Sequence, residues 1–255
     1  MNILCIGNSF AEDVSTYVHK IAEAAHEDLN IYVLYIGGCP ISRHLKNIRT
    51  GDKEYFFMEN GGEKIVTWVD IFYGLKFVKY DYITFQQVSQ DSWNVDTYFP
   101  YLIELMEEVR KYSDAKFVIH QTWSYGKYYQ HYKYGQNPLD QEAMTKDVRN
   151  AYIEAAKRVN IPYIIPSGEA IKNARKIFGD ELNRDGFHLN ERGRTLTGYL
   201  LAFYFLGDKI DVSSFRPSGH TYNEAGDPPV DEKELPTLVE IAKETLKENE
   251  GHNLK

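Results

Sequence analysis

The sequence predicts an α/β fold: a three-layer α/β/α sandwich around a central, mainly parallel sheet of five strands. Short apolar runs alternate along the chain with helical patterns, which is typical of parallel sheets. The 255 residues are 43% hydrophobic and 26% charged, an ordinary globular composition with enough chain for a sizeable core. No internal repeat and no convincing linker interrupts the alternation. We therefore expect a single domain over residues 1–255, with its core at about 2–207 and a C-terminal extension over 208–255.

The parallel strands are expected at five short apolar runs. These runs cover residues 2–6, 31–36, 82–87, 116–120 and 162–165. Two further runs, at 55–58 and 64–68, flank the turn sequence Asn60-Gly61-Gly62. This pair is expected to form a hairpin inserted in a crossover connection.

Helices are expected where apolar residues recur every three or four positions. The first expected helix, at about 13–27, places a set of apolar residues on one face: Val14, Val18, Ile21, Ala22 and Ala25. Further helices are expected at 98–111, 141–158 and 191–205, and an amphipathic helix at 235–246. Another is expected to begin at Ser167, which can cap it, with Glu169 in its first turn.

Two stretches lack such periodicity. Residues 121–139 are expected to form a long surface loop dense in aromatic side chains. After Gly207 the chain is polar and rich in Gly and Pro as far as Pro229.

The charge of the chain argues against nucleic acid as a partner. Asp and Glu outnumber Lys and Arg, 37 to 29, which gives a formal net charge of -8. Such a surface repels phosphate backbones and anionic lipid, although a local basic pocket remains compatible with it. The 20 Tyr residues suit stacking against sugar rings, but most of them are expected simply to pack.

No disulfide framework, metal site or membrane span is expected. The two cysteines are Cys5, inside an apolar strand, and Cys39, and neither belongs to a zinc-binding pattern. The longest apolar stretch, near 200–206, is too short to cross a bilayer. The N-terminus runs directly into a strand without a signal-peptide pattern. The location is therefore expected to be cytoplasmic if Met1 is the native start, and periplasmic or secreted if a leader was removed.

Ser9 lies where an α/β sheet presents its ligands. The first strand ends in Gly7-Asn8-Ser9-Phe10, and open α/β sheets bind ligands beyond the carboxyl ends of their strands. Ser9 is therefore either a nucleophile or an ordinary helix cap.

A possible base for Ser9 comes much later, in Asp185-Gly186-Phe187-His188. A serine hydroxyl is a weak nucleophile until a base accepts its proton. His188 can act as that base, while Asp185 can orient the imidazole ring and stabilise its charged form. The alternative is a surface Asp beside a His that caps or packs.

The two motifs together resemble the SGNH (GDSL-like) hydrolase family. That family carries its nucleophilic serine just after the first strand, like Gly7-Asn8-Ser9-Phe10, and an Asp-x-x-His block before the final helix, like Asp185 to His188. The order of the motifs differs from that of α/β-hydrolases, whose Gly-x-Ser-x-Gly elbow is absent. The resemblance implies a flavodoxin-like SGNH fold, a Ser9–His188–Asp185 triad, and no metal or organic cofactor.

The resemblance also implies an oxyanion hole. The amide of Ser9 and a glycine of the second block donate to the oxyanion in this family, and Gly38 in Gly37-Gly38-Cys39-Pro40 is the best match. An ordinary strand-ending turn is the alternative for Gly38.

The third block departs from the family. Where SGNH enzymes have Gly-x-Asn-Asp, with the Asn amide as a donor, this chain has Gln86-Gln87-Val88-Ser89-Gln90. An amide on a longer stem can make an equivalent donor. We expect Gln87 in that role, with Gln90 as the alternative register. Gln-Gln-x-Ser resembles a divergent, uncharacterised sub-branch of SGNH-like proteins.

The resemblance to this sub-branch covers about residues 2–207 and includes His44 and His120, which we leave outside the catalytic set. It implies removal of acyl groups from carbohydrate. Trp123 and Tyr125 are expected to contact the sugar, as are Tyr128 and Tyr129, although all four are equally suited to packing their own loop.

Three functions remain open from the sequence. The first is an esterase acting on a small acyl group, acetyl by default, of a glycan or small molecule. The second is a carbohydrate-binding protein whose catalysis was lost with the altered third block. The third is a lipase or thioesterase that prefers longer acyl chains.

Overall fold

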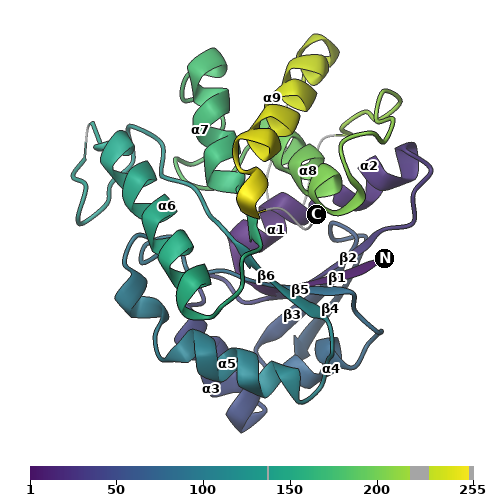
Figure 1. The fold of residues 1–255 in the computed structure, drawn as a ribbon, viewed down its shortest axis with the longest axis vertical. Helices are drawn as coiled ribbons and strands as arrows, with labels where there is room; N and C mark the ends of the chain where they lie inside the picture. The colour runs from purple at the N-terminus through teal and green to yellow at the C-terminus, as the bar shows by residue number, and fades with distance from the viewer. Residues whose placement is uncertain (137, 219–229, 253–255) are drawn as a thin grey trace.

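A computed structural model describes residues 1–136, 138–218 and 230–252 of the chain. Within these residues one sheet holds seven strands in the order β4-β3-β2-β1-β5-β6-β7 (Figure 1). The strands are β1 (Asn2–Gly7), β2 (Asn30–Tyr35), β3 (Tyr55–Glu59), β4 (Lys64–Val69), β5 (Tyr82–Phe85), β6 (Lys116–His120) and β7 (Ile164–Ile165).

The predicted core of five parallel strands is confirmed. β2, β1, β5, β6 and β7 pair in parallel, and their apolar runs are buried because helices cover both faces of the sheet. The predicted hairpin forms as β3 and β4. It extends the same sheet antiparallel to β2, so the sheet is larger than the five strands expected.

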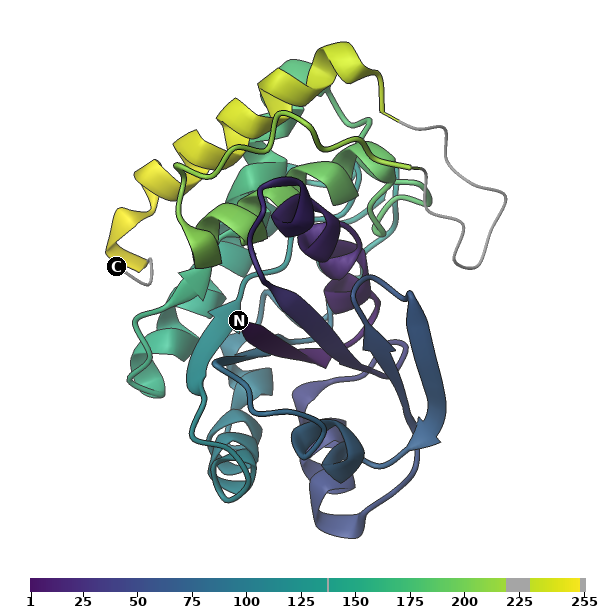
Figure 2. The same cartoon turned by 90° about the vertical axis from the view of Figure 1, so that its right-hand side faces the viewer.

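The helices form the two outer layers of the predicted sandwich (Figures 1 and 2). One face of the sheet carries α1 (Ser9–Ser15), α2 (Val18–Ala24), α7 (Ser167–Phe178), α8 (Glu191–Leu206) and α9 (Leu235–Glu248), and the other carries α3 (Ile41–Thr50), α4 (Ile71–Leu75) and α5 (Tyr101–Arg110). α6 (Gln141–Arg158) runs beside β6 and β7. α9 packs on α7 and α8, outside both of them (Figure 2).

Some helix boundaries differ from the sequence prediction. The helix expected from residue 13 begins at Ser9 and is divided into α1 and α2. The helices α3 and α4 were not expected, because residues 41–50 and 71–75 were left unassigned in the sequence. Ser167 is the first residue of α7, and Pro166 occupies the capping position.

Residues 121–139 were expected to form a surface loop, but the first part of this segment is buried. Residues 121–126 are buried, and Trp123 has no exposed surface. The polar stretch expected between Gly207 and Pro229 lies partly outside the described residues, from 219 onward. In the part of the chain that the structure describes, no helix has both the length and the apolar character needed to cross a membrane.

The parallel strands all end at the same edge of the sheet. β1 leads there into Ser9, β2 into Gly37 and Gly38, and β5 into Gln86. Loops from distant parts of the sequence therefore meet at this edge, where open α/β sheets place their sites.

Candidate active site

Ser9 is the first residue of α1 and does not cap the helix. Asn8 occupies the capping position, with a φ of -134°, and its side chain accepts a hydrogen bond from the Phe10 amide at 3.1 Å. Gly7 allows a close exit from β1, since a Cβ atom there would lie 2.8 Å from the Cβ of Ala11. Because Asn8 takes the capping role, the hydroxyl of Ser9 is available for another partner.

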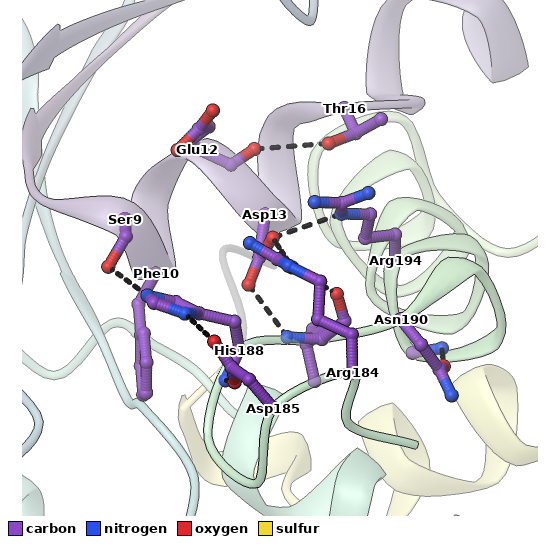
Figure 3. A network of polar contacts seen from close by, with 12 residues as sticks. Ser9, Phe10, Glu12, Asp13, Thr16, Arg184, Asp185, His188, Asn190 and Arg194 are labelled. Carbon is purple, nitrogen blue, oxygen red and sulfur yellow. Dashed lines mark hydrogen bonds and ion pairs between the residues drawn. The ribbon is translucent and has the colours of Figure 1, made fainter. Parts of the chain in front are cut away.

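That partner is His188. Ser9 Oγ lies 2.8 Å from His188 Nε2, and His188 Nδ1 lies 2.6 Å from Asp185 Oδ2 (Figure 3). The other carboxylate oxygen of Asp185 accepts hydrogen bonds from the amides of Phe187 at 3.2 Å and His188 at 2.8 Å. The structure thus brings together the three side chains that the sequence singled out, in the order hydroxyl, imidazole, carboxylate.

The surroundings of Asp185 favour its ionised form. Partial burial acts to raise the pKa of Asp185, but hydrogen bonds from the His188 ring and from the His188 and Phe187 amides outweigh it and lower the pKa to about 2. An ionised Asp185 accepts a hydrogen bond from Nδ1–H of His188, which leaves Nε2 as the ring nitrogen that accepts a hydrogen bond from Ser9 Oγ.

Asp13 joins the helix of Ser9 to the loop of His188. Its fully buried carboxylate accepts a hydrogen bond from the Leu189 amide at 2.8 Å. It also accepts hydrogen bonds from Arg184 Nη1 at 2.9 Å and from Arg194 Nε at 3.0 Å (Figure 3). The sequence analysis missed Asp13. The only sequence feature that could have pointed to Asp13 is its position four residues after Ser9, on the same face of a helix.

Ser9 and Gly38 are the residues whose amides the resemblance assigned to an oxyanion hole. Both residues line one pocket, and in the described part of the chain neither amide donates a hydrogen bond. Gly38 has a φ of +60°, a left-handed conformation that glycine adopts without strain. Asn8 Nδ2 donates to the Cys39 carbonyl at 3.2 Å and thereby connects this turn to the turn that carries Ser9.

The expectation that Gln87 serves as an oxyanion donor is corrected. Its side-chain nitrogen donates to the carbonyl and the hydroxyl of Thr97, at 3.0 and 3.1 Å. Its side-chain oxygen accepts from the amides of Ile41 and Val88, at 3.1 and 2.9 Å. Gln87 is therefore a buried structural residue, whereas Gln90, the alternative register, is exposed and lines the pocket.

Gln86 belongs to a buried chain of hydrogen bonds that ends at Asn8, the residue before Ser9. Ser167 Oγ and Gln86 Oε1 each lie 2.9 Å from a ring nitrogen of His120, and Gln86 Nε2 donates to Asn8 Oδ1 at 2.8 Å. Burial lowers the pKa of His120 to about 3, so the ring is neutral. Donation then runs in one direction from Ser167 through His120 and Gln86 to Asn8. No role for Gln86 or Asn8 was predicted from the sequence.

The pocket beside Ser9 has a volume of about 450 Å³. Polar and aromatic side chains line it, among them Glu12, Tyr35, Gln90, Tyr125, Tyr129 and Arg184. Tyr125, one of the predicted substrate contacts, is therefore a pocket residue. Its hydroxyl lies 3.0 Å from Ser89 Oγ, and burial raises its pKa to about 12.

The expectation that Trp123 contacts the substrate is corrected. Its ring has no exposed surface and stacks on Phe10, with ring centroids 4.1 Å apart and an angle of 4° between the planes. Its indole nitrogen donates to the Phe187 carbonyl at 2.8 Å. Trp123 is therefore a buried packing residue that contacts Phe10 and Phe187, the neighbours of Ser9 and His188 in the sequence. Tyr128, which is 77% exposed, lies outside the pocket.

No group of three or more His, Cys, Asp or Glu side chains that could hold a metal ion occurs among the residues described. Cys5 and Cys39 are free and buried, and burial raises their pKa values to about 11 and about 12. Neither thiol has the low pKa of a reactive cysteine.

Comparison with known proteins relates the chain to a family of unknown function. A family model described as a domain of unknown function, DUF4886, matches residues 2–225. The crystal structure of a DUF4886 family protein from Bacteroides uniformis is 32% identical, with a TM-score of 0.80 over 97% of this chain and 95% of that chain. None of the curated proteins matches the chain.

A more distant structure identifies the fold. A protein from Slackia heliotrinireducens that is provisionally described as an SGNH hydrolase is 22% identical, with a TM-score of 0.54 over 79% of this chain and 97% of that chain. The fold is therefore that of SGNH hydrolases, as the sequence predicted.

Proposed function

The chain belongs to the DUF4886 family, and we propose that it is a serine esterase of SGNH type that removes a small acyl group, acetyl, from a carbohydrate. The observation that carries the proposal is the 2.8 Å distance between Ser9 Oγ and His188 Nε2, with Asp185 behind the imidazole. This is hydrogen-bond distance, as a nucleophile and its general base require.

Acylation begins with attack by Ser9. Its oxygen forms a bond to the ester carbonyl carbon while its proton passes to His188 Nε2. The carbonyl oxygen becomes an oxyanion, which the amides of Ser9 and Gly38 stabilise. Each such donor contributes a few kcal/mol, on the order of 3, to the transition state. Ionised Asp185 stabilises the imidazolium.

The tetrahedral intermediate then collapses. The bond between the carbonyl carbon and the alcohol oxygen breaks, and His188 gives its proton to that oxygen, so that the alcohol leaves and an acyl-Ser9 ester remains. A water molecule attacks the carbonyl carbon of this ester, and His188 accepts a proton from the water. Return of that proton to Ser9 Oγ releases the carboxylic acid and the free enzyme.

Carbohydrate as the carrier of the acyl group is supported by the lining of the pocket. Tyr35, Tyr125, Tyr129 and Gln90 offer groups that donate or accept hydrogen bonds next to aromatic faces. Sugars bind through hydrogen bonds to their hydroxyl groups and through stacking on their faces.

The test is hydrolysis of p-nitrophenyl esters and of partly acetylated sugars by the whole chain. We expect turnover of p-nitrophenyl acetate and release of acetate from acetylated sugars. Preference for octanoate over acetate would replace the proposal with a lipase or thioesterase. Sugar binding without turnover of any ester would replace it with a carbohydrate-binding protein.

A further inference from the structure

Glu12 brings a second carboxyl group to the pocket of the triad. It lies three positions after Ser9 on α1 (Figure 3). Both residues line the same pocket. Glu12 is 9% exposed. It plays no part in the proton transfers from Ser9 to His188.

The carboxyl group of Glu12 has no hydrogen-bond or ion-pair partner among the described residues. Only its backbone carbonyl accepts hydrogen bonds, from the hydroxyls of Ser15 and Thr16. The neighbouring Asp13, by contrast, is fully satisfied by Leu189, Arg184 and Arg194.

A carboxyl group that is mostly shielded from water and has no partner in the protein is unfavourable. Burial, followed by the charge of Asp13, raises the pKa of Glu12 to about 7, although Arg194, Arg184 and His188 act in the opposite direction. Unpaired polar groups of this kind in a pocket are typical of binding sites, where a ligand supplies the missing partner.

The surroundings indicate which ligand fits. Arg184 lines the same pocket and disfavours a cation, while Asp185 and Glu12 itself disfavour an anion. A hydroxyl group is neutral and both donates and accepts hydrogen bonds, so it can pair with a carboxyl group in either protonation state. The phenol of Tyr129 and the amide of Gln90, which share the pocket, have the same versatility.

We propose that the side chain of Glu12 binds hydroxyl groups of the alcohol part of the ester and selects polyhydroxylated alcohols over plain ones. Glu12 is then a specificity-determining residue, distinct from the triad. This inference rests on the proposed esterase function and adds the group that recognises the sugar.

The test compares two matched kinds of ester. One is a panel of methyl glucosides and xylosides that carry a single acetyl group and keep their other hydroxyls, and the other is cyclohexylmethyl acetate, which has a ring without hydroxyls. We expect the wild type to prefer its best sugar ester by at least about 10-fold in kcat/KM, the effect of one hydrogen bond to a charged group. In Glu12→Ala this ratio should fall toward one, mainly through a higher KM for the sugar ester.

Two further variants sharpen the result. Glu12→Gln should keep most of the preference, because its amide still donates and accepts hydrogen bonds. Glu240→Ala removes an exposed carboxylate on α9, outside the pocket, and should keep the wild-type ratio. Thermal unfolding of each variant confirms that it is folded.

A wild type without preference for sugar esters, or a Glu12→Ala variant with an unchanged ratio, would overturn the role of Glu12 while leaving the esterase intact. Absence of turnover of every ester, including p-nitrophenyl acetate, would instead refute the proposed function on which the inference rests.

Discussion

The carboxylate of Asp13 accepts a hydrogen bond from the backbone amide of Leu189, 176 positions later in the chain. Asp13 lies on the helix that begins with Ser9, and Leu189 directly follows His188. The buried contact therefore holds the loop of His188 against the helix of Ser9. Arg184 and Arg194 neutralise the charge of Asp13 from the other side.

Replacement of Asp13 should damage both stability and activity. Asp13→Ala leaves the buried guanidinium of Arg194 and the Leu189 amide without this acceptor. Breaking a buried ion pair by removing one partner costs about 3–5 kcal/mol, and we expect a loss of that order in the free energy of unfolding, measured in urea. Asp96→Ala, at an exposed position with a single long contact to Arg158, should change it by less than about 0.5 kcal/mol. Equal effects of the two substitutions would refute this role of Asp13.

Asn8 joins the turn of Ser9 to the turn of Gly38, and one substitution removes only one of the three hydrogen bonds of its side chain. In Asn8→Asp the carboxylate still accepts from the Phe10 amide and caps α1, but it cannot donate to the Cys39 carbonyl. We expect kcat for p-nitrophenyl acetate to fall about 10-fold or more, because Gly38 is no longer held in place, while KM changes little. The melting temperature should fall as well, because the new carboxylate is buried and faces the Cys39 carbonyl oxygen, so kcat is measured at a temperature at which the variant is folded. An unchanged kcat would show that the contact with Cys39 does not position the oxyanion site.

Gln87 and Gln90 should respond to substitution in opposite ways. Gln87→Ala removes the acceptor of the Ile41 and Val88 amides, so the protein should unfold at a lower temperature. Gln90→Ala should leave the melting temperature unchanged, because the Gln90 side chain is exposed. It should lower kcat about 10-fold or more if its amide donates to the oxyanion. A Gln90→Ala variant with wild-type kcat would exclude Gln90 from the oxyanion hole.

The buried carboxyl of Glu12 should make stability depend on pH. Its pKa is raised from 4.5 to about 7, so the folded state holds a proton that the unfolded state has released over this interval. The free energy of unfolding should therefore fall as the pH rises from about 4.5 to about 7, by up to about 3 kcal/mol from this group. Glu12→Gln lacks this contribution, so its stability relative to the wild type should rise across the same interval. Denaturant unfolding at pH 4.5 and pH 7.5 measures the change, and parallel pH profiles would contradict it.

The parallel strands could be predicted from the sequence because each is a short apolar run bounded by polar or turn-forming residues. The placement of Ser9 at the carboxyl edge of the sheet followed from the same reasoning. The placement of Asp185 and His188 beside it came from the resemblance to SGNH hydrolases, because no strand leads into their loop. The roles of Trp123 and Gln87 could not be predicted, because they depend on which neighbours the fold supplies. Phe10 stacks on Trp123. The hydrogen bonds of the Gln87 side chain are made with Thr97, Ile41 and Val88.

Glu12 and Asp13 illustrate the same limit. They are adjacent acidic residues in one helix, and nothing in their local sequence distinguishes them. Only the folded chain places Arg184, Arg194 and the Leu189 amide around Asp13 and leaves Glu12 facing the pocket.

The central claim is that His188 activates Ser9 as a nucleophile, and covalent labelling tests it most directly. The whole chain is treated with diisopropyl fluorophosphate, and the modified peptide is identified by mass spectrometry. We expect one label on Ser9 in the wild type, no label in Ser9→Ala, and labelling of His188→Ala slower by about 1,000-fold or more. A wild type that does not react at Ser9, or a His188→Ala variant that reacts as fast as the wild type, would contradict the account.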